Sequence, residues 1–246
     1  MGETWRLVDS GTVRPAESAA LDEAILEAHS AGSVPDTLHF YVRSSPTVSV
    51  GYFQKAAESL DLEACRRLGV QVVRRGSGGS SIYTDRGQLI YGLVVRSEEL
   101  PPTPEASFAL VCGAVARAVS SFGVDARHRP VNDVEVGGRK VSGSAQLRRR
   151  GSVLQHGTVI LDTDLKTMDS VLRHGAGPRP SERVTTMAAL LGEVPDVGEV
   201  KRRIRDEVAR AFGVGMAEGG LTAAEKRCVE RLVAGRYSRE EWNMRL

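Results

Sequence analysis

The stretch of sequence that decides the fold covers residues 131–161 and reads VNDVEVGGRKVSGSAQLRRRGSVLQHGTVIL. The glycines at 137–138 and the Arg-Arg-Arg-Gly run at 148–151 divide it into three segments that contain β-branched or aliphatic residues. Segments of this kind, separated by glycine-containing turns, are typical of antiparallel strands. We therefore expect three consecutive strands, which favour an antiparallel or mixed sheet over alternating βαβ units.

Outside this stretch, strand patterns dominate the first part of the chain and helix patterns dominate its end. Residues 174–183 are rich in glycine, proline and arginine, which predicts a loop or lid. The order of elements predicts a single α+β domain over residues 1–246, with a mixed, largely antiparallel β-sheet flanked by helices. Strands are predicted over 5–8, 37–42, 47–52, 70–75 and 88–96, and helices over 15–29, 59–68, 103–122, 164–173, 199–212 and 222–236.

The composition is that of an ordinary globular protein. Hydrophobic residues make up 41% and charged residues 26%, and no apolar run is long enough for a membrane helix. A net charge of +2 and only 5% aromatic residues argue against nucleic-acid binding. The three cysteines are odd in number and widely spaced, which argues against a disulfide framework or a zinc site. The first residues lack the pattern of a signal peptide, so we expect a cytoplasmic protein.

A glycine-rich segment follows the predicted strand 70–75 and reads RRGSGGSSIY over residues 74–83. Glycine lets backbone N–H groups approach a ligand, and consecutive N–H groups can cradle an anion. The two neighbouring arginines, Arg74 and Arg75, would add positive charge and donors for phosphate. From the residues alone, an anion-binding loop and a flexible turn with solvated arginines are about equally acceptable.

A lysine lies within the second predicted strand of the opening stretch. Strand alternation places Lys140 on the same face as Ser142, Ser144 and Gln146, and opposite Arg139. A lysine on a face of small polar residues can stabilise a phosphate or a developing oxyanion. The residues alone favour the simpler interpretation, which is a solvent-facing lysine beside a turn.

Two further features of the opening stretch have a functional and a structural interpretation. His156 could act as a base or a ligand, but such a histidine is more often a hydrogen-bonded structural residue. The basic turn at 148–150 could be a solvated hairpin tip or could dock an acidic partner.

Taken together and in order, these motifs resemble a known family. They are similar to the motifs of the lipoate–protein ligase A family, a branch of the biotin/lipoate ligase superfamily: RRGSGG at 74–79, NDV at 132–134, GGRKVSGSAQ at 137–146 and HGTVIL at 156–161. The resemblance extends to ESAALDEAILE at 17–27, GYFQ at 51–54 and YSREEWN at 237–243. The last motif is similar to the ending of archaeal-type catalytic subunits of bipartite ligases and of related octanoyltransferases.

The resemblance implies an α+β catalytic domain and a reaction in two steps. In this family, lipoate attacks the α-phosphate of ATP to give lipoyl-adenylate, and a lysine of an acceptor protein then takes the lipoyl group. The implied ligands are ATP with Mg²⁺, and lipoate as substrate. The implied acceptor is an apo lipoyl-domain protein or an H-protein-like carrier.

The resemblance also assigns roles to individual residues. Lys140 would lie between the phosphate and the acyl carbonyl, where it would stabilise charge in both steps. Asn132 and Asp133 would bind the adenylate end, and Asp133 could hold Mg²⁺. The other implied residues would form the lipoyl and nucleotide pocket: Arg75, Ser77, Gly78, Gly79, Tyr83, Thr84, Gly143, Ser144, Ala145 and His156.

Two departures from the family pattern affect this expectation. Thr84 stands where the family usually has a histidine before Asp85, so a contact to the nucleotide or the acyl chain would be lost. The chain stops just after Trp242 and Asn243, without the additional C-terminal domain of full bacterial ligases. We therefore expect a separately encoded accessory subunit.

Other functions compete with the ligase. An octanoyl- or lipoyltransferase of the same superfamily uses no ATP and forms a thioester on a cysteine, assisted by the same lysine. That cysteine is expected within residues 128–133, which read HRPVND, so the ligase is favoured. The cysteines present, Cys65, Cys112 and Cys228, fall in predicted helices, where buried structural thiols are usual. A biotin ligase ranks third within the superfamily. A non-catalytic lipoyl-protein-binding paralogue would have little reason to keep Lys140.

Overall fold

An eight-stranded sheet forms the centre of the computed structural model, which describes residues 3–245. Its strands are β1 (Thr4–Val13), β2 (Thr37–Arg43), β6 (Gln88–Arg96), β7 (Ala126–Arg129), β8 (Asp133–Val136), β9 (Arg139–Arg149), β10 (Ser152–Ile160) and β11 (Gly215–Gly219). They lie in the order β11-β1-β2-β6-β10-β9-β8-β7. β1 is parallel to β11 and to β2, and every other neighbouring pair is antiparallel. The predicted mixed, largely antiparallel sheet is confirmed.

The three strands predicted over residues 131–161 are β8, β9 and β10, and both turns between them are tight. Val136 pairs with Arg139 across Gly137 and Gly138, whose φ angles are +57° and +77°. At the second turn, Arg150 and Gly151 have φ angles of +49° and +78°. Two positive φ angles match the right-handed twist of a hairpin, which explains the glycines in the pattern.

A second, three-stranded sheet has the order β4-β3-β5. Its strands are β3 (Thr47–Val50), β4 (Gln71–Arg74) and β5 (Ile82–Thr84), and β5 lies within a segment for which the sequence analysis predicts no strand. Three short helices pack on this sheet around a core of their own that includes Leu60, Cys65 and Tyr83. These helices are α2 (Ala56–Ser59), α3 (Leu62–Arg67) and α5 (Leu165–Val171).

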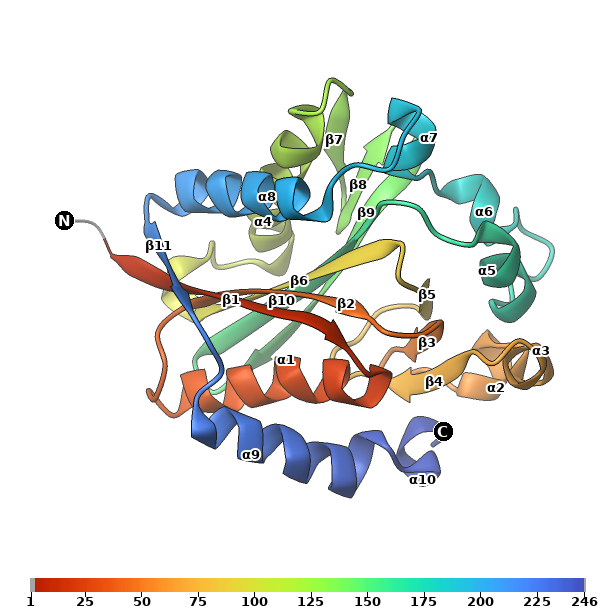
Figure 1. Ribbon diagram of the computed structural model, residues 1–246, viewed down its shortest axis with the longest axis horizontal. Helices are drawn as coiled ribbons and strands as arrows, with labels where there is room; N and C mark the ends of the chain where they lie inside the picture. The colour runs from red at the N-terminus through yellow and green to blue at the C-terminus, as the bar shows by residue number, and fades with distance from the viewer. Residues whose placement is uncertain (1–2, 246) are drawn as a thin grey trace.

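Helices cover both faces of the large sheet (Figure 1). On one face lie α4 (Pro104–Ser120) and α8 (Val197–Phe212), which enclose the main core with residues such as Trp5, Val115 and Ile204. On the other face, α1 (Pro15–Ser30) packs on the strands through Ile25 and Leu26, and α9 (Ala223–Leu232) packs on α1. No helix within residues 3–245 is both long and apolar enough to span a bilayer.

The remaining elements are short. They are a 3₁₀ turn η1 (Ser97–Glu99), α6 (Pro180–Arg183), α7 (Met187–Leu191), a π-helical turn η2 (Val233–Tyr237) and α10 (Glu240–Asn243). The predicted helix over 59–68 is divided at Leu60, which pairs with Leu172 in an isolated bridge. Most of the predicted loop over 174–183 is irregular, and its last four residues form α6.

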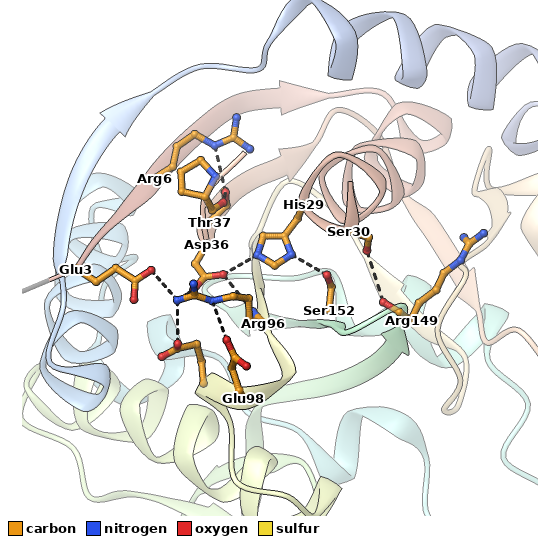
Figure 2. Close-up of polar contacts among 12 residues, drawn as sticks. Glu3, Arg6, His29, Ser30, Asp36, Thr37, Arg96, Glu98, Arg149 and Ser152 are labelled. Carbon is orange, nitrogen blue, oxygen red and sulfur yellow. Dashed lines mark hydrogen bonds and ion pairs between the residues drawn. The ribbon is translucent and has the colours of Figure 1, made fainter. Parts of the chain in front are cut away.

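A buried polar network joins α1 to the strands at the end of the sheet where β1 begins (Figure 2). His29 Nε2 lies 2.6 Å from Asp36 Oδ1, and its Nδ1 lies 2.8 Å from Ser152 Oγ. The Arg96 guanidinium lies among the carboxylates of Glu3, Asp36 and Glu99. Those three carboxylates could otherwise hold a cation, but all three already form ion pairs with the Arg96 guanidinium.

Candidate functional site

A cavity of about 790 Å³ lies between α1, the middle of the large sheet and the loop that joins β4 to β5. It brings together most of the residues selected from the sequence: Arg75, Ser77, Gly78, Gly79, Asn132, Asp133, Lys140, Gly143, Ser144, Ala145 and His156. Tyr83 and Thr84 do not line it. Tyr83 is buried in the core of the small sheet, and Thr84 Oγ1 accepts a hydrogen bond of 2.7 Å from Arg43.

Lys140 directs its ammonium into this cavity, so the expectation of a solvent-facing lysine is wrong. Its Nζ lies 2.6 Å from Asp133 Oδ1. A Cβ built on Gly143 would lie 2.2 Å from Nζ, so only glycine leaves room for the ammonium at that position. The backbone is fixed as well, because the Lys140 carbonyl accepts a 2.8 Å hydrogen bond from the N–H of Thr185.

The predicted face of β9 is also wrong, because a bulge interrupts the alternation. Glu135 pairs with Lys140 but Val134 pairs with Ser142, which leaves Val141 as an extra residue. Beyond the bulge, the side chains of Ser144 and Gln146 contact groups on the α4 side: Ser144 Oγ lies 3.5 Å from Cys112 Sγ, and Gln146 binds Gln155. Lys140 therefore lies on the cavity face with Gly143 and Ala145.

Asn132 and Asp133 fix the N-terminal end of β8 through their contacts. The Asn132 side chain donates to the Ser144 carbonyl, and the Ser144 N–H donates to the Asn132 carbonyl at 2.9 Å. Asp133 also forms an ion pair of 2.8 Å with Arg129. Its carboxylate is thus shared between two cations of the chain, and its role as a Mg²⁺ ligand stays a prediction.

The glycine-rich loop is arranged around the buried Arg75 side chain. This guanidinium donates to the carbonyls of Ser49, Gly78 and Ser80 at 2.7 to 2.8 Å, which turns these carbonyls inward. Burial first, and then the charge of Arg43, lowers the pKa of Arg75 to about 10, so it remains charged at neutral pH. Within residues 3–245, none of the backbone N–H groups of residues 76–81 donates to a protein acceptor. These free donors favour the anion-binding interpretation over a flexible turn.

Arg74, in contrast, does not contribute to the cavity. Its side chain is fully buried and donates to six backbone carbonyls, those of Gly51, Tyr52, Gln54, Trp242, Asn243 and Arg245. The expectation that both arginines would supply donors to a ligand is therefore wrong for Arg74. Its donors instead join the C-terminal segment to the cavity wall.

Ser77, His156 and Asp22 form a hydrogen-bonded array on the cavity wall. Ser77 Oγ lies 2.6 Å from His156 Nε2, and His156 Nδ1 lies 2.6 Å from Asp22 Oδ2. Burial opposes the ionisation of Asp22, but His156 and His39 outweigh it and hold the pKa of this carboxyl well below its usual range. The sequence analysis does not select Asp22. An acidic residue among the apolar residues of one helix face nevertheless indicates a buried carboxylate, which is uncommon and therefore informative.

None of the cysteines lines the cavity in the part of the chain that the structure describes. Cys65 belongs to the core of the small sheet and Cys112 to the main core, as expected for structural thiols. Burial raises the pKa of Cys112 to about 11, and burial also raises the pKa of Cys228 on α9. No activated thiolate is therefore available at the site.

A sequence model of the lipoyl protein ligase A/B catalytic domain matches residues 14–209. The chain belongs to this family. Among solved structures, it is similar to lipoate-protein ligase A bound with ATP, with a TM-score of 0.87 and 28% identity over 99% of both chains. It is also similar to a bipartite lipoate protein ligase from Thermoplasma acidophilum, with a TM-score of 0.86 and 28% identity over 99% of this chain and 96% of that one. The resemblance seen in the sequence and the predicted fold are confirmed.

Among curated proteins of this family, the similar sequences are octanoyltransferases. The chain is 37% identical to octanoyltransferase LipM of Symbiobacterium thermophilum over the whole of both chains. It is 34% identical to LipM of Kyrpidia tusciae over 99% of both, and 31% identical to LipM of Bacillus subtilis over 98% of both. The expectation of an ATP-dependent lipoate–protein ligase is therefore wrong. The alternative, an octanoyl- or lipoyltransferase, agrees better with the names of these relatives. The absence of a cysteine within 128–133 does not exclude the chain from a group of transferases.

Proposed function

We propose that this protein is an octanoyltransferase, which moves an octanoyl group from a thioester donor to a lysine of a lipoyl-domain protein without ATP. The observation that carries the proposal is the full-length similarity to octanoyltransferases of the LipM type. A transferase needs no nucleotide, because the thioester bond of the donor already activates the acyl group.

The cavity has the composition that an acyl chain requires. Apolar side chains form part of its lining, and the chain of an eight-carbon acid could lie against them. Those side chains are Ala19, Ile82, Ile90, Ala145, Leu147 and Leu154. Lys140 and residues 76–80 of the glycine loop, whose N–H groups have no protein acceptor within residues 3–245, line the same cavity. This combination suits a substrate with an apolar tail and one polar reacting centre.

Lys140 would act on the acyl carbonyl. When the carbonyl carbon is attacked, negative charge develops on its oxygen, and a fixed ammonium stabilises that charge. Asp133 holds the ammonium at 2.6 Å and keeps it in one position before the substrate arrives. A positioned cation needs little reorganisation during the reaction, which is the condition under which electrostatic stabilisation is most effective.

A lipoyl-domain protein is the proposed acceptor, because the structural work on the similar bipartite ligase from Thermoplasma acidophilum covers that ligase and its E2 lipoyl domain. The need for a separately encoded accessory subunit stays a prediction. Assays with the chain alone test it directly.

The test is a transfer assay with three acyl sources. Purified protein is mixed with an apo lipoyl domain and with either octanoyl-pantetheine thioester, octanoate with ATP and Mg²⁺, or lipoate with ATP and Mg²⁺. Intact-mass spectrometry of the lipoyl domain detects the added acyl group. We expect modification from the thioester alone, unchanged by ATP. Modification only from the free acids with ATP, or from no source, would overturn the proposal.

A further inference from the structure

A transferase that passes its acyl group through the enzyme needs a nucleophile, and no cysteine lines the cavity within residues 3–245. Serines and a threonine do line it, namely Ser49, Ser77, Ser80, Ser144 and Thr158, although the Ser144 hydroxyl turns toward Tyr91 and Cys112. Among the residues that the structure describes, only Ser77 of this set forms a hydrogen bond with a histidine. A serine hydroxyl becomes a useful nucleophile only when a base can take its proton, so this contact singles out Ser77.

The base is in turn oriented by a carboxylate. Asp22 Oδ2 accepts a hydrogen bond from Nδ1–H of His156, which leaves Nε2 as the acceptor for the Ser77 hydroxyl. Asp22 also accepts a hydrogen bond of 3.1 Å from Tyr41. The order serine, histidine and aspartate, with both contacts at 2.6 Å, meets the geometric requirement for an activated hydroxyl.

A similar array elsewhere in the molecule shows that hydrogen bonds joining a serine, a histidine and an aspartate do not by themselves indicate catalysis. Ser152, His29 and Asp36 are connected in the same order through the opposite ring nitrogens, with Ser152 Oγ 2.8 Å from Nδ1 and Asp36 Oδ1 2.6 Å from Nε2 (Figure 2). Ser152 does not line the cavity, and its neighbours are the buried groups that join α1 to the sheet. The hydrogen-bonded order alone is therefore compatible with a structural role, and the surroundings of the serine must decide.

Ser77 has two features that Ser152 lacks. It lies within the loop of free N–H donors, and the N–H of Gly78, the residue that follows the serine, can bind an oxyanion formed there. In addition, the Arg75 side chain donates to Ser77 Oγ at 3.1 Å, which stabilises negative charge on that oxygen.

Lys140 lies on the same cavity face. Its ammonium lies beside Gly143, which pairs with Thr158 on β10. Two residues further along β9, Ala145 pairs with His156. That spacing is one pleat of a strand, or about 7 Å. The glycine loop lies over the second pair, since a Cβ built on Gly79 would be 4.0 Å from Ala145 Cβ. One acyl carbonyl could thus be approached by the serine from the loop and by the ammonium from the sheet.

We propose that Ser77 carries the acyl group as a covalent ester during transfer, with His156 as its base and Asp22 as the residue that positions His156. The inference rests on the proposed octanoyltransferase function. It adds a serine route to a family member whose cavity has no cysteine.

The steps balance as two acyl transfers. Ser77 Oγ attacks the carbonyl carbon of the donor thioester while its proton passes to His156 Nε2. The carbon–sulfur bond breaks, and the leaving thiolate takes that proton. The lysine amine of the acceptor then attacks the ester carbon and gives a proton to His156. The carbon–oxygen bond breaks, the amide remains on the acceptor, and the proton returns to Ser77 Oγ.

The experiment separates the two half-reactions. Wild-type protein is incubated with octanoyl-pantetheine thioester without acceptor, quenched in acid, and mapped by peptide mass spectrometry. We expect one octanoyl group on the peptide that contains Ser77, and its loss when apo lipoyl domain is added. Ser77→Ala should form no adduct and should transfer at least about 100-fold more slowly. Ser77→Cys should carry a thioester at the same position, which neutral hydroxylamine removes.

Ser152→Ala is the matched control, because it removes the serine of the other array. Assayed well below its melting temperature, it should form the adduct and transfer within about threefold of wild type, since a buried side chain away from the reacting groups makes no contact with the transition state.

Three outcomes would be decisive against the inference or its premise. Transfer by the wild type without an adduct on Ser77 in the donor-only reaction, or with the adduct on another residue, would overturn the serine route and leave the octanoyltransferase intact. An adduct on Ser77 that no lipoyl domain can discharge would keep the serine route and reject the acceptor. Neither adduct nor transfer would mean that the proposed function itself fails.

Discussion

The side-chain oxygen of Asn243 accepts a 2.9 Å hydrogen bond from the backbone N–H of Arg74, although the two residues are 169 positions apart. The Asn243 amide also donates to the Tyr237 carbonyl at 3.0 Å. Both contacts are buried, and they place α10 against β4, the strand that precedes the loop carrying Ser77. The wall of the cavity therefore depends on the last turn of the chain that the structure describes.

Asn243→Ala should destabilise the protein. The substitution leaves the Arg74 N–H and the Tyr237 carbonyl without partners, and an unsatisfied buried group costs about 1–3 kcal/mol. The measurement is the free energy of unfolding in urea for wild type and variant. An unchanged midpoint would show that the contact between α10 and β4 carries no stability.

Gly143→Ala should reduce activity more than stability. Its Cβ would lie 2.2 Å from both Cε and Nζ of Lys140, and the end of a flexible side chain can move away at small cost. The displaced ammonium would no longer reach the acyl carbonyl, and losing one such stabilising group lowers kcat by about 100- to 1,000-fold.

Gly220→Ala is the control for that substitution, since nothing lies within 4 Å of the position its Cβ would take. The readouts are initial rates of octanoyl transfer and melting temperatures for both variants. Equal rates for the two variants would contradict the assigned position of Lys140.

Asp22→Asn should lower kcat with little change in KM. An amide cannot hold His156 in the tautomer that accepts the Ser77 proton, and in a hydrolase template the same change costs about 10⁴-fold in kcat. His39→Gln alters a histidine whose Nδ1 lies 3.9 Å from the same carboxylate, on a side chain that does not line the cavity. Similar kinetic losses for the two variants would indicate that Asp22 acts only on stability.

Glu225→Gln should destabilise the protein in a pH-dependent way. Burial opposes the ionisation of Glu225, but hydrogen bonds from Arg6 and the backbone of Thr222, with the charge of Arg6, lower its pKa. A lowered pKa in the folded state adds stability above the pKa of the unfolded chain, about 4.3, and that stability is lost as the pH falls through the folded value.

The unfolding free energies of wild type and Glu225→Gln should therefore differ by about 3 kcal/mol at pH 7, as for one partner removed from a buried pair. The difference should shrink steadily as the pH is lowered below about 4.3. Urea titrations at a series of pH values test this, and a difference that is independent of pH would contradict it.

Much of the fold could be predicted because its signals are local. Glycines at 137–138 and 151 occupy positions with positive φ, so the hairpins that supply three of the eight strands of the large sheet are visible in the sequence. The glycine-rich loop and Lys140 both reach the cavity for the same reason, since each belongs to a short motif with its own geometry.

The site details that depend on distant contacts could not be predicted. Nothing in the sequence around Val141 marks it as a bulge, because the shift appears only when β9 is paired with β8. Arg74 and Arg75 are adjacent residues of the same type, so the local sequence does not distinguish them. Arg74 points away from the cavity and binds carbonyls within residues 242–245, which are distant in sequence. The octanoyltransferase group is predicted only as the alternative to the ligase, because the choice between the two rests on one expected cysteine.

The contacts of Arg74 also affect the order in which the protein can mature. Synthesis proceeds from the N-terminus, so β3, β4 and the glycine loop leave the ribosome long before residues 242–245 exist. Until those residues emerge, the Arg74 guanidinium lacks three of its six carbonyl partners. The other three lie in residues 51–54, a segment that includes part of the cavity wall, so this wall is incompletely joined to β4. A nascent chain should therefore complete this wall only after residues 242–245 have left the ribosome.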